Sequence, residues 1–157
     1  MKTEELAREV ISKLTDEGRT LSTAESCTGG LLGKLLTDIP GASNAYKGGV
    51  ISYVNEVKHR ILGVEQETLD VCTAVSRETA HEMAKGTRAL LKADVGVSTT
   101  GLAGPDGDGT GRPIGLVYVA LDMDGFSYCR ELHLKGDRAE IRAQAAHEAL
   151  SMLLEFL

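Results

Sequence analysis

Several features that define common classes of protein are missing from this sequence. Its three cysteines are widely spaced and form no C-x-x-C pair, which favours reduced thiols over a disulfide framework. No apolar stretch approaches the roughly 20 residues of a membrane-spanning helix. The amino-terminal segment MKTEELAREV is charged and has no signal-peptide core. We therefore expect a cytoplasmic protein with no membrane partner.

A surplus of positive charge is also missing. The formal net charge is −6 at pH 7, whereas a general binder of nucleic acid or of a membrane surface needs a basic face. The four histidines show no H-x-x-x-H spacing, and no histidine, cysteine and carboxylate stand together at ligand spacing. We expect neither a metal site nor a nucleic-acid partner.

What is present is the composition of an ordinary globular protein. Hydrophobic residues make up 42% of the 157 residues, which is enough for a domain with a hydrophobic core. The sequence shows no internal repeat, linker or low-complexity stretch. We therefore expect residues 1–157 to form one domain.

The order of the local patterns predicts an α/β protein. Apolar residues at helical spacing predict helices over residues 4–17, 31–39, 55–63, 76–92 and 137–157. Runs of β-branched and aromatic residues predict strands over 20–24, 48–54 and 95–100, and a hairpin of 114–123 and 126–134 that turns at Asp124-Gly125. Strands that alternate with helices, plus one hairpin, predict a three-layer α/β/α sandwich with a mixed sheet.

Capping residues mark several helix boundaries. Thr3, Asn55 and Ser76 are expected as N-caps of the helices that follow them. Asp137 with Glu140 forms a variant capping box before the last helix. These boundaries leave three polar junctions at the ends of strands, where layered α/β sheets bind ligands.

The first junction is TAESCTGG, residues 23–30, where a strand runs into a helix. Ser26 is placed to present its hydroxyl while backbone N–H groups point the same way, as a nucleophile would need. From this stretch alone, a simple helix N-cap is the plainer role for Ser26 or Thr28. Cys27 would act as a nucleophile only with a lowered pKa, and no histidine partner stands nearby, so a buried apolar role suits it better.

The second junction is YVNEVK, residues 53–58. If Asn55 caps the helix, Lys58 lies in its first turn, where the helix dipole and burial would lower the pKa of its amine towards that of a useful base. Ser–Lys pairs are a known nucleophile–base arrangement, and Tyr53 could orient the lysine or relay a proton. From these residues alone, an exposed Lys58 and a half-buried Tyr53 are the plainer alternatives.

The third junction, residues 99–113, holds the glycine-rich loop GLAGPDGDGTGRP. A loop of this length in a compact domain is usually functional or mobile. Thr100, Gly101 and Gly104 would let the backbone approach a ligand closely. Asp106 and Asp108 faintly resemble a calcium loop but lack its twelve-residue ligand pattern, so calcium is not expected.

Together, four motifs resemble one family. AESCTGG, GVISYVNEVKHRILGV, TGLAGPDG and the GDR before the last helix are similar to the CinA C-terminal domain over nearly the whole chain. That family includes the nicotinamide mononucleotide (NMN) amidohydrolases, or NMN deamidases. The family's amino-terminal molybdopterin-binding-like domain does not occur in this sequence, so the resemblance is to the stand-alone form. The sequence departs from the family at Thr73, where a glycine is usual, and in its longer, more acidic third loop.

The resemblance implies an activity and a mechanism. It implies hydrolysis of the NMN carboxamide to nicotinic acid mononucleotide and ammonia, in pyridine nucleotide salvage, by a homodimer without metal or cofactor. By position, Ser26 matches the nucleophile, Lys58 the base and Tyr53 the third member. A backbone amide or Thr100 is expected to stabilise the oxyanion.

The phosphate of such a substrate needs local positive features in a protein of negative net charge. We expect the substrate to be bound by the start of the second helix, the end of the third strand and one arginine, that is, by Thr28, Gly29, Gly30, Thr100, Gly101 and Arg142. Arg112 and Arg138 are further candidates. Arg142 is preferred because it lies beside the inward-facing Ile141, whereas Arg138 fits a surface ion pair equally well.

Two other functions stay open at this point. A nucleotide-binding regulatory module would keep the pocket without turnover, in line with the family's association with competence and DNA damage. A third alternative is hydrolysis of another pyridine nucleotide or small amide. The lysine at the start of a helix favours the enzyme, since a binding module has no need of it.

Overall fold

The computed structural model describes residues 1–157 and contains one five-stranded sheet. The strands are β1 (Leu21–Glu25), β2 (Tyr46–Ile51), β3 (Val95–Gly101), β4 (Leu116–Met123) and β5 (Phe126–His133), in the spatial order β2-β1-β3-β4-β5. β1 pairs in parallel with β2 and β3, whereas β3, β4 and β5 pair antiparallel. The predicted mixed sheet and its hairpin at Asp124-Gly125 are confirmed.

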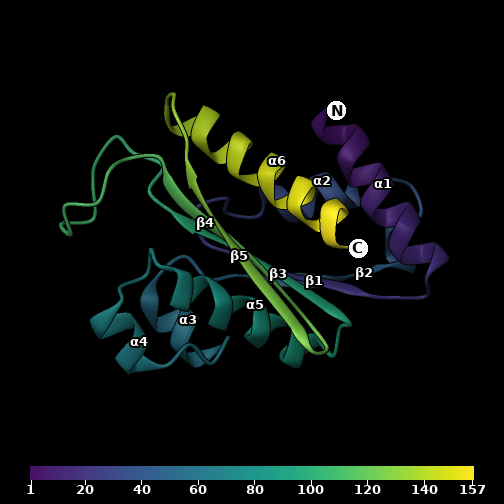
Figure 1. Cartoon of the computed structure of the whole chain (residues 1–157), viewed down its shortest axis with the longest axis horizontal. Helices are drawn as coiled ribbons and strands as arrows, with labels where there is room; N and C mark the ends of the chain where they lie inside the picture. The colour runs from purple at the N-terminus through teal and green to yellow at the C-terminus, as the bar shows by residue number, and fades with distance from the viewer.

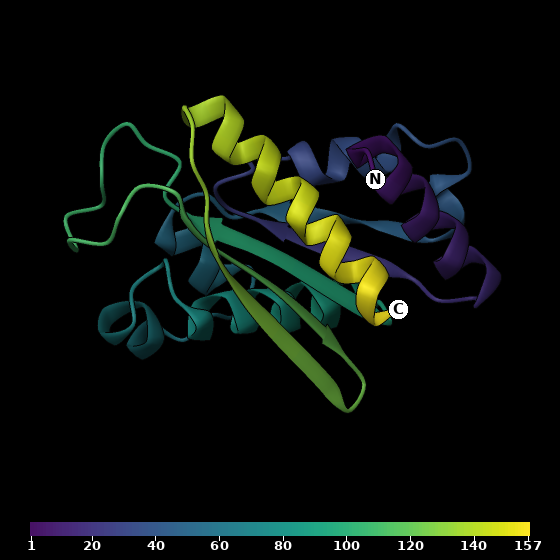
Figure 2. The same cartoon turned by 45° about the horizontal axis from the view of Figure 1, so that its top comes forward.

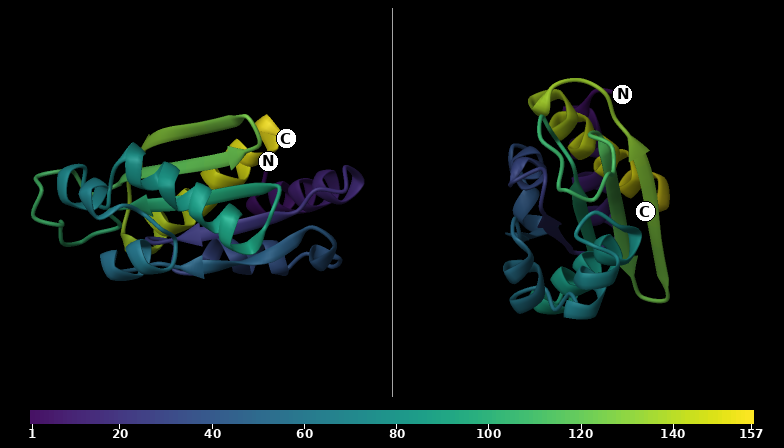
Figure 3. Two further views of the ribbon diagram at one scale, coloured as in Figure 1. Left: turned by 90° about the horizontal axis from the view of Figure 1, so that it is seen from below. Right: turned by 90° about the vertical axis from the view of Figure 1, so that its left-hand side faces the viewer.

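Helices cover both faces of this sheet. They are α1 (Thr3–Asp16), α2 (Leu31–Thr37), α3 (Asn55–Arg60), α4 (Gln66–Val71), α5 (Arg77–Leu91) and α6 (Arg138–Phe156), with a short 3₁₀ turn at Ala42–Asn44. α1, α2 and α6 lie on one side of the sheet and α3, α4 and α5 on the other (Figure 1), and the turned views keep the two groups apart (Figures 2 and 3). The three-layer α/β/α arrangement is therefore confirmed. None of the helices is long and apolar enough to cross a membrane.

The main hydrophobic core lies between the sheet and the α1, α2 and α6 layer. It is a cluster of 25 buried residues, and α6 contributes the inward positions expected from its spacing, such as Ile141, Ala145 and Ala149. Two smaller clusters fill the space beneath α5 and the α3–α4 segment. β1 is buried along its whole length because helices cover both of its faces. The residue that follows β1 is consequently held in a rigid setting.

Two predicted helix caps are confirmed and two are wrong. The Ser76 hydroxyl accepts from the Thr79 amide, and the Asp137–Glu140 capping box forms before α6. α1 begins one residue earlier than expected, with Lys2 at the cap position, and the Thr3 hydroxyl bonds instead to His147 of α6. Val54, not Asn55, holds the N-cap position of α3.

The segment between β2 and α5 differs most from the prediction. β2 ends at Ile51 rather than at residue 54, and its last contact with β1 runs from the Ser52 amide to the Glu25 carbonyl at 2.7 Å. α3 ends at Arg60, and α4 was not predicted. α4 buries only Leu69, so its sequence carries no periodic apolar pattern to indicate a helix.

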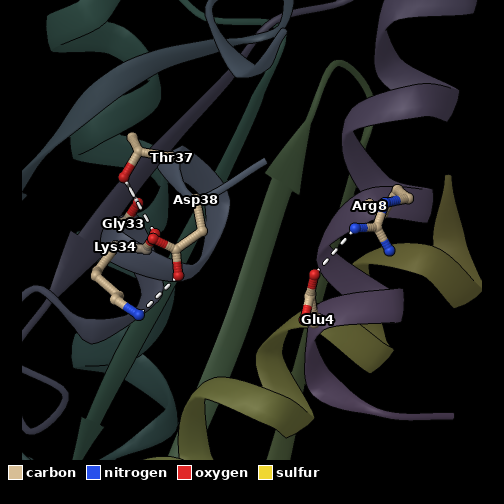
Figure 4. Close-up of polar contacts among 6 residues, drawn as sticks. All are labelled: Glu4, Arg8, Gly33, Lys34, Thr37 and Asp38. Atoms are coloured by element: carbon tan, nitrogen blue, oxygen red, sulfur yellow. Dashed lines mark hydrogen bonds and ion pairs between the residues drawn. The ribbon is translucent and has the colours of Figure 1, made fainter. Parts of the chain in front are cut away.

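Solvent-exposed ion pairs lie on the outer surfaces of α1 and α2. Glu4–Arg8 and Lys34–Asp38 are spaced four residues apart at 3.0 and 2.7 Å, and Thr37 donates to the Gly33 carbonyl within α2 (Figure 4). Such solvent-exposed pairs contribute little to stability, typically below about 1 kcal/mol. They keep the outer helix faces polar and play no part in the site described next.

Candidate active site

The carboxyl ends of the parallel strands β1, β2 and β3 meet at one edge of the sheet and surround a cavity of ≈ 270 Å³. β1 leads to Ser26, β2 leads through residues 52–54 to α3, and β3 ends in the long glycine-rich loop. The residues of the cavity wall include Ser26, Tyr53, Lys58, Thr100, Gly101 and Arg138. The three junctions singled out in the sequence therefore meet in space.

Lys58 and Ser26 are in direct contact inside this cavity. The Lys58 Nζ lies 2.9 Å from the Ser26 Oγ, 2.7 Å from the Ser52 carbonyl oxygen and 3.1 Å from the Tyr53 carbonyl oxygen. Lys58 is 1% exposed. A neutral amine has two N–H bonds and one lone pair, so two N–H bonds to the carbonyls leave the lone pair for the Ser26 hydroxyl. The geometry suits a nucleophile paired with its base.

Burial controls the protonation of this lysine. Desolvation lowers the pKa of Lys58 from 10.5 to about 8, and the neighbouring Cys27 acts in the opposite direction. No carboxylate forms an ion pair with the amine. The expectation that the helix dipole contributes is not supported, because Lys58 is the fourth residue of a helix of only six. The cause of the lowered pKa is the buried position itself.

Tyr53 contacts Lys58 through its backbone and not through its phenol. Its carbonyl accepts from Lys58, whereas its hydroxyl accepts from the Arg138 Nη2 at 3.0 Å. The side chain is exposed at the mouth of the cavity. The structure thus brings all three expected catalytic residues to one cavity, but it places the phenol on the solvent side.

Cys27 has the properties of a core residue. Its side chain belongs to the main hydrophobic cluster, and burial raises the pKa of the thiol to about 12. A thiol of that pKa supplies almost no thiolate at neutral pH. Of the two neighbours, Ser26 is therefore the better nucleophile.

The structure gives no support to the expected phosphate site at the start of α2, because the protein's own Glu25 accepts from its amides. The Glu25 carboxylate accepts from the amides of Gly30, Leu32 and Gly33 at 2.8–3.2 Å and from the Thr28 hydroxyl at 2.6 Å. Thr28, Gly29 and Gly30 also lie outside the wall of the cavity. The amides that would hold a phosphate already have an acceptor.

The three candidate arginines also occupy different places. Arg142 donates to the backbone carbonyls of Cys27 and Thr28 at 3.0 and 3.1 Å, so it fastens α6 to the turn after β1 and does not line the cavity. Arg112 donates to the Thr73 hydroxyl and the Cys72 carbonyl. Arg138 alone of the three lines the cavity. The structure therefore does not support the preference for Arg142, because its guanidinium is bonded to the backbone of the turn after β1.

Thr100 and Gly101 line the cavity as expected. The Thr100 hydroxyl donates to the Ala74 carbonyl at 2.7 Å, so its proton is already used. A Cβ at position 101 would lie 2.5 Å from Val117, which explains the glycine. None of the backbone hydrogen bonds is donated by the Cys27 or Thr28 amide, which leaves both amides next to Ser26 available.

Sequence reasoning missed part of the wall. Ala74 and Val75 come from the turn after α4, and Asp106 and Asp108 from the loop after β3. Thr73, which departs from the family pattern, has φ 69° and anchors Arg112 through its hydroxyl. The departure from the family pattern at Thr73 was the signal in the sequence that pointed to this turn. No group of three or more His, Cys, Asp or Glu side chains is placed to hold a metal ion.

The fold and the cavity define a class of protein: three-layer α/β proteins with a buried serine–lysine pair at the carboxyl edge of the parallel strands. The chain belongs to the CinA C-terminal domain family, whose sequence model matches residues 3–157.

Relatives and solved structures agree with this assignment. A protein of Caldanaerobacter subterraneus subsp. tengcongensis is 49% identical over 154 residues, and a CinA-like protein of Syntrophomonas wolfei is 45% identical over 148. They are matched over 98% and 94% of this chain, which spans only 37% and 36% of their lengths. The crystal structure of competence damage-inducible protein A (ComA) from Klebsiella pneumoniae superposes with a TM-score of 0.96 at 37% identity, over 99% of this chain and 96% of that one. The crystal structure of competence/damage inducible protein CihA from Agrobacterium tumefaciens superposes with a TM-score of 0.94 at 42% identity. The match covers 98% of this chain and 94% of that one.

Proposed function

We propose that the protein hydrolyses the carboxamide of nicotinamide mononucleotide to nicotinic acid mononucleotide and ammonia. The observation that carries the proposal is the 2.9 Å contact between the Ser26 Oγ and a buried Lys58 amine. A family that includes NMN amidohydrolases supports the choice of substrate.

The serine–lysine pair suits a two-step acyl transfer. The neutral Lys58 amine takes the proton of Ser26 as the Oγ attacks the amide carbon, and a tetrahedral intermediate forms. Lys58 returns that proton to the amide nitrogen, the C–N bond breaks, and ammonia leaves behind an ester on Ser26. Lys58 then takes a proton from a water molecule as its oxygen attacks the ester carbon. Lys58 returns that proton to the Ser26 Oγ as the acyl C–O bond breaks, which releases the carboxylic acid product and restores the Ser26 hydroxyl and the neutral amine.

Backbone amides are the best candidates to stabilise the oxyanion. In many serine hydrolases the amide of the residue after the nucleophile does this. Here that residue is Cys27, and its amide, like that of Thr28, donates no hydrogen bond in the protein. The Thr100 hydroxyl is a poorer candidate because it is already bonded to Ala74.

Arg138 and Tyr53 are placed to meet the rest of the substrate. Arg138 is the only arginine in the wall of the cavity. Its Nη1 donates to the Gly104 carbonyl and its Nη2 to the Tyr53 hydroxyl, which leaves a second N–H on each nitrogen for phosphate oxygens. Because Arg138 donates to the Tyr53 oxygen, the phenolic proton stays free for the substrate or for the leaving amine. We assign Arg138 to the phosphate and Tyr53 to this polar contact.

We further propose that the protein is a homodimer that acts in the cytoplasm. Its three cysteines are free thiols, as a reducing compartment would maintain. Ile51, Tyr53 and Val54 are all more than half exposed beside the open edge of β2, and contiguous exposed apolar side chains of this kind mark interaction surfaces.

The test is ammonia release from NMN by the purified protein, with nicotinamide riboside and unrelated small amides in parallel. We expect turnover of NMN, which disappears in Ser26→Ala. Tight binding of NMN without ammonia release would instead favour a nucleotide-binding regulatory module. Faster hydrolysis of an unphosphorylated amide would contradict the role given to Arg138.

A further inference from the structure

Glu25 is a buried carboxylate for which the proposed mechanism has no use. It is 2% exposed and takes part in no ion pair. Burying an anion without a cationic partner is costly unless several hydrogen-bond donors surround it. Four donors do so here, all from the turn and helix that follow Ser26.

The Glu25 carboxylate holds the segment that follows Ser26 in the chain. Its Oε1 accepts from the Thr28 hydroxyl at 2.6 Å and the Leu32 amide at 2.8 Å, and its Oε2 accepts from the Gly33 amide at 3.0 Å. Gly30, the N-cap residue of α2, has no side chain to satisfy these amides. Glu25 therefore ties residues 28–33 back to the end of β1, with Ser26 inside the resulting loop.

The backbone of the same residue supports the base. The Glu25 carbonyl accepts from the Ser52 amide at 2.7 Å and from the Ser52 hydroxyl at 3.3 Å. The Ser52 carbonyl in turn accepts from the Lys58 amine at 2.7 Å. Glu25 thus supports both members of the pair. Its side chain holds the turn that carries Ser26, and its main-chain carbonyl holds Ser52, which contacts Lys58.

We propose that Glu25 is a positioning residue whose carboxylate holds the turn after β1 so that Ser26 faces Lys58. This rests on the proposed Ser–Lys chemistry, but not on the identity of the natural substrate. Because Lys58 is held by main-chain carbonyls, loss of the carboxylate should move the serine and leave the titration of the base unchanged.

The test uses Glu25→Gln, which keeps the size of the side chain but replaces one acceptor oxygen by an NH₂ group. That group would face either the Gly33 amide or the amides of Gly30 and Leu32, donor against donor. The matched control is Asp94→Asn, a carboxylate that accepts from the Thr20 amide and hydroxyl at the opposite end of β1. Folding of each variant is checked by circular dichroism and thermal unfolding.

Two readouts separate positioning from plain stability. The first is the rate at which a fluorophosphonate probe labels Ser26 between pH 6 and pH 10, which needs no natural substrate. The second is the division of any loss of NMN hydrolysis between kcat and KM. We expect Glu25→Gln to lower the labelling plateau and kcat by roughly 10²-fold, the effect of a misplaced reacting group, with the pH midpoint and KM unchanged. Asp94→Asn should label like the original protein.

Each other result has a definite meaning. Labelling of Glu25→Gln at the original rate, a displaced pH midpoint, or an equal loss in Asp94→Asn would overturn the proposal. If Glu25→Gln does not fold, Thr28→Val removes one donor from the carboxylate and should lower the labelling rate several-fold at an unchanged midpoint, and an unchanged rate would again overturn it. Rapid Ser26 labelling without ammonia release from NMN would contradict the proposed function and leave the role of Glu25 supported.

Discussion

At the residue scale, burial shifts Lys58 towards its neutral form, and no carboxylate is paired with its amine. Its amine is enclosed by a serine hydroxyl and two main-chain carbonyls, and burial alone lowers its pKa to about 8. Carbonyl oxygens favour the charged amine, so the lowered pKa means that the loss of water outweighs them. A fraction of the lysine is therefore neutral at physiological pH.

The first prediction concerns the pH dependence that follows from Lys58. The neutral amine is the active form, so kcat/KM should rise as the pH increases through about 8, the pKa of Lys58 in the folded protein. Lys58→Arg should lower kcat by about 10²–10⁴-fold, because a guanidinium does not accept the serine proton. Steady-state ammonia release across pH 6–10 checks both. Near-normal turnover in Lys58→Arg would show that position 58 serves only as a positive charge.

The second prediction compares the neighbouring side chains of Ser26 and Cys27. Ser26→Ala should reduce ammonia release to background while the fold is retained, because it removes the hydroxyl that the proposed mechanism uses as the nucleophile. Cys27→Ala should keep most of the activity and lose about 1 kcal/mol of stability, the cost of a small core cavity. Activity and thermal unfolding are measured on both variants. An inactive, folded Cys27→Ala would reverse the assignment of the nucleophile.

At the scale of secondary structure, one glycine decides how the α3–α4 segment packs. Gly86 lies inside α5, and a Cβ there would come within 1.9 Å of the Leu62 carbonyl oxygen. The same turn is bonded to α3, because the Val64 amide donates to the Lys58 carbonyl at 3.1 Å. Close approach at Gly86 therefore supports the helix that carries the base.

The third prediction is that Gly86→Ala destabilises the protein although alanine is the better helix former. Overpacking against the Leu62 backbone should cost about 1–3 kcal/mol, more than the helix-propensity gain of about 1 kcal/mol. Gly107→Ala, in open space at the tip of the loop, is the control and should change stability little. Chemical denaturation measures the difference, and equal stability of the two variants would contradict the close contact.

Elements with a strong local signal were predictable, and those shaped by a distant partner were not. The hairpin at Asp124-Gly125 and α6 with its Asp137 box follow from turn chemistry and apolar spacing. The strand ends indicated where a site would lie, but Ser26 and Lys58 were singled out as a pair by the resemblance to the CinA family, since each residue alone fitted a plainer role. The role of Arg142 depends on a side chain that reaches from α6 to the turn after β1, and no local pattern encodes that contact. Glu25 binds the amides of Gly30, Leu32 and Gly33 from a position before the turn, which the usual N-cap pattern does not predict.

At the scale of the whole molecule, the strand order creates the crevice. From β1 the chain passes through α2 on one face to β2, and then through α5 on the other face to β3, on the opposite side of β1. In open α/β sheets, ligands bind at the carboxyl ends of two neighbouring strands whose following connections lie on opposite faces of the sheet. The Ser–Lys pair stands at this point, whereas the antiparallel β4 and β5 contribute the far edge and the core.

The fourth prediction concerns assembly. We expect light scattering after gel filtration to give twice the mass of one chain. Ile51→Lys places a charge on a side chain that is 56% exposed at the end of the edge strand β2, and it should shift the protein towards the monomer. Leu90→Lys, an equally exposed apolar position on α5, is the control and should leave the mass unchanged. A monomeric original protein would contradict the proposed homodimer.

The carbonyl cradle of Lys58 also bears on how this site can be diversified. Both carbonyls belong to the main chain of residues 52 and 53, so no side-chain replacement at these two positions deletes them. The phenol of Tyr53 lies at the mouth of the cavity, whereas its main-chain carbonyl accepts from Lys58. A substitution at position 53 therefore removes the phenol and keeps the carbonyl. If the proposed function holds, a saturation library at position 53 would vary substrate preference while every member keeps the main-chain contacts of Lys58.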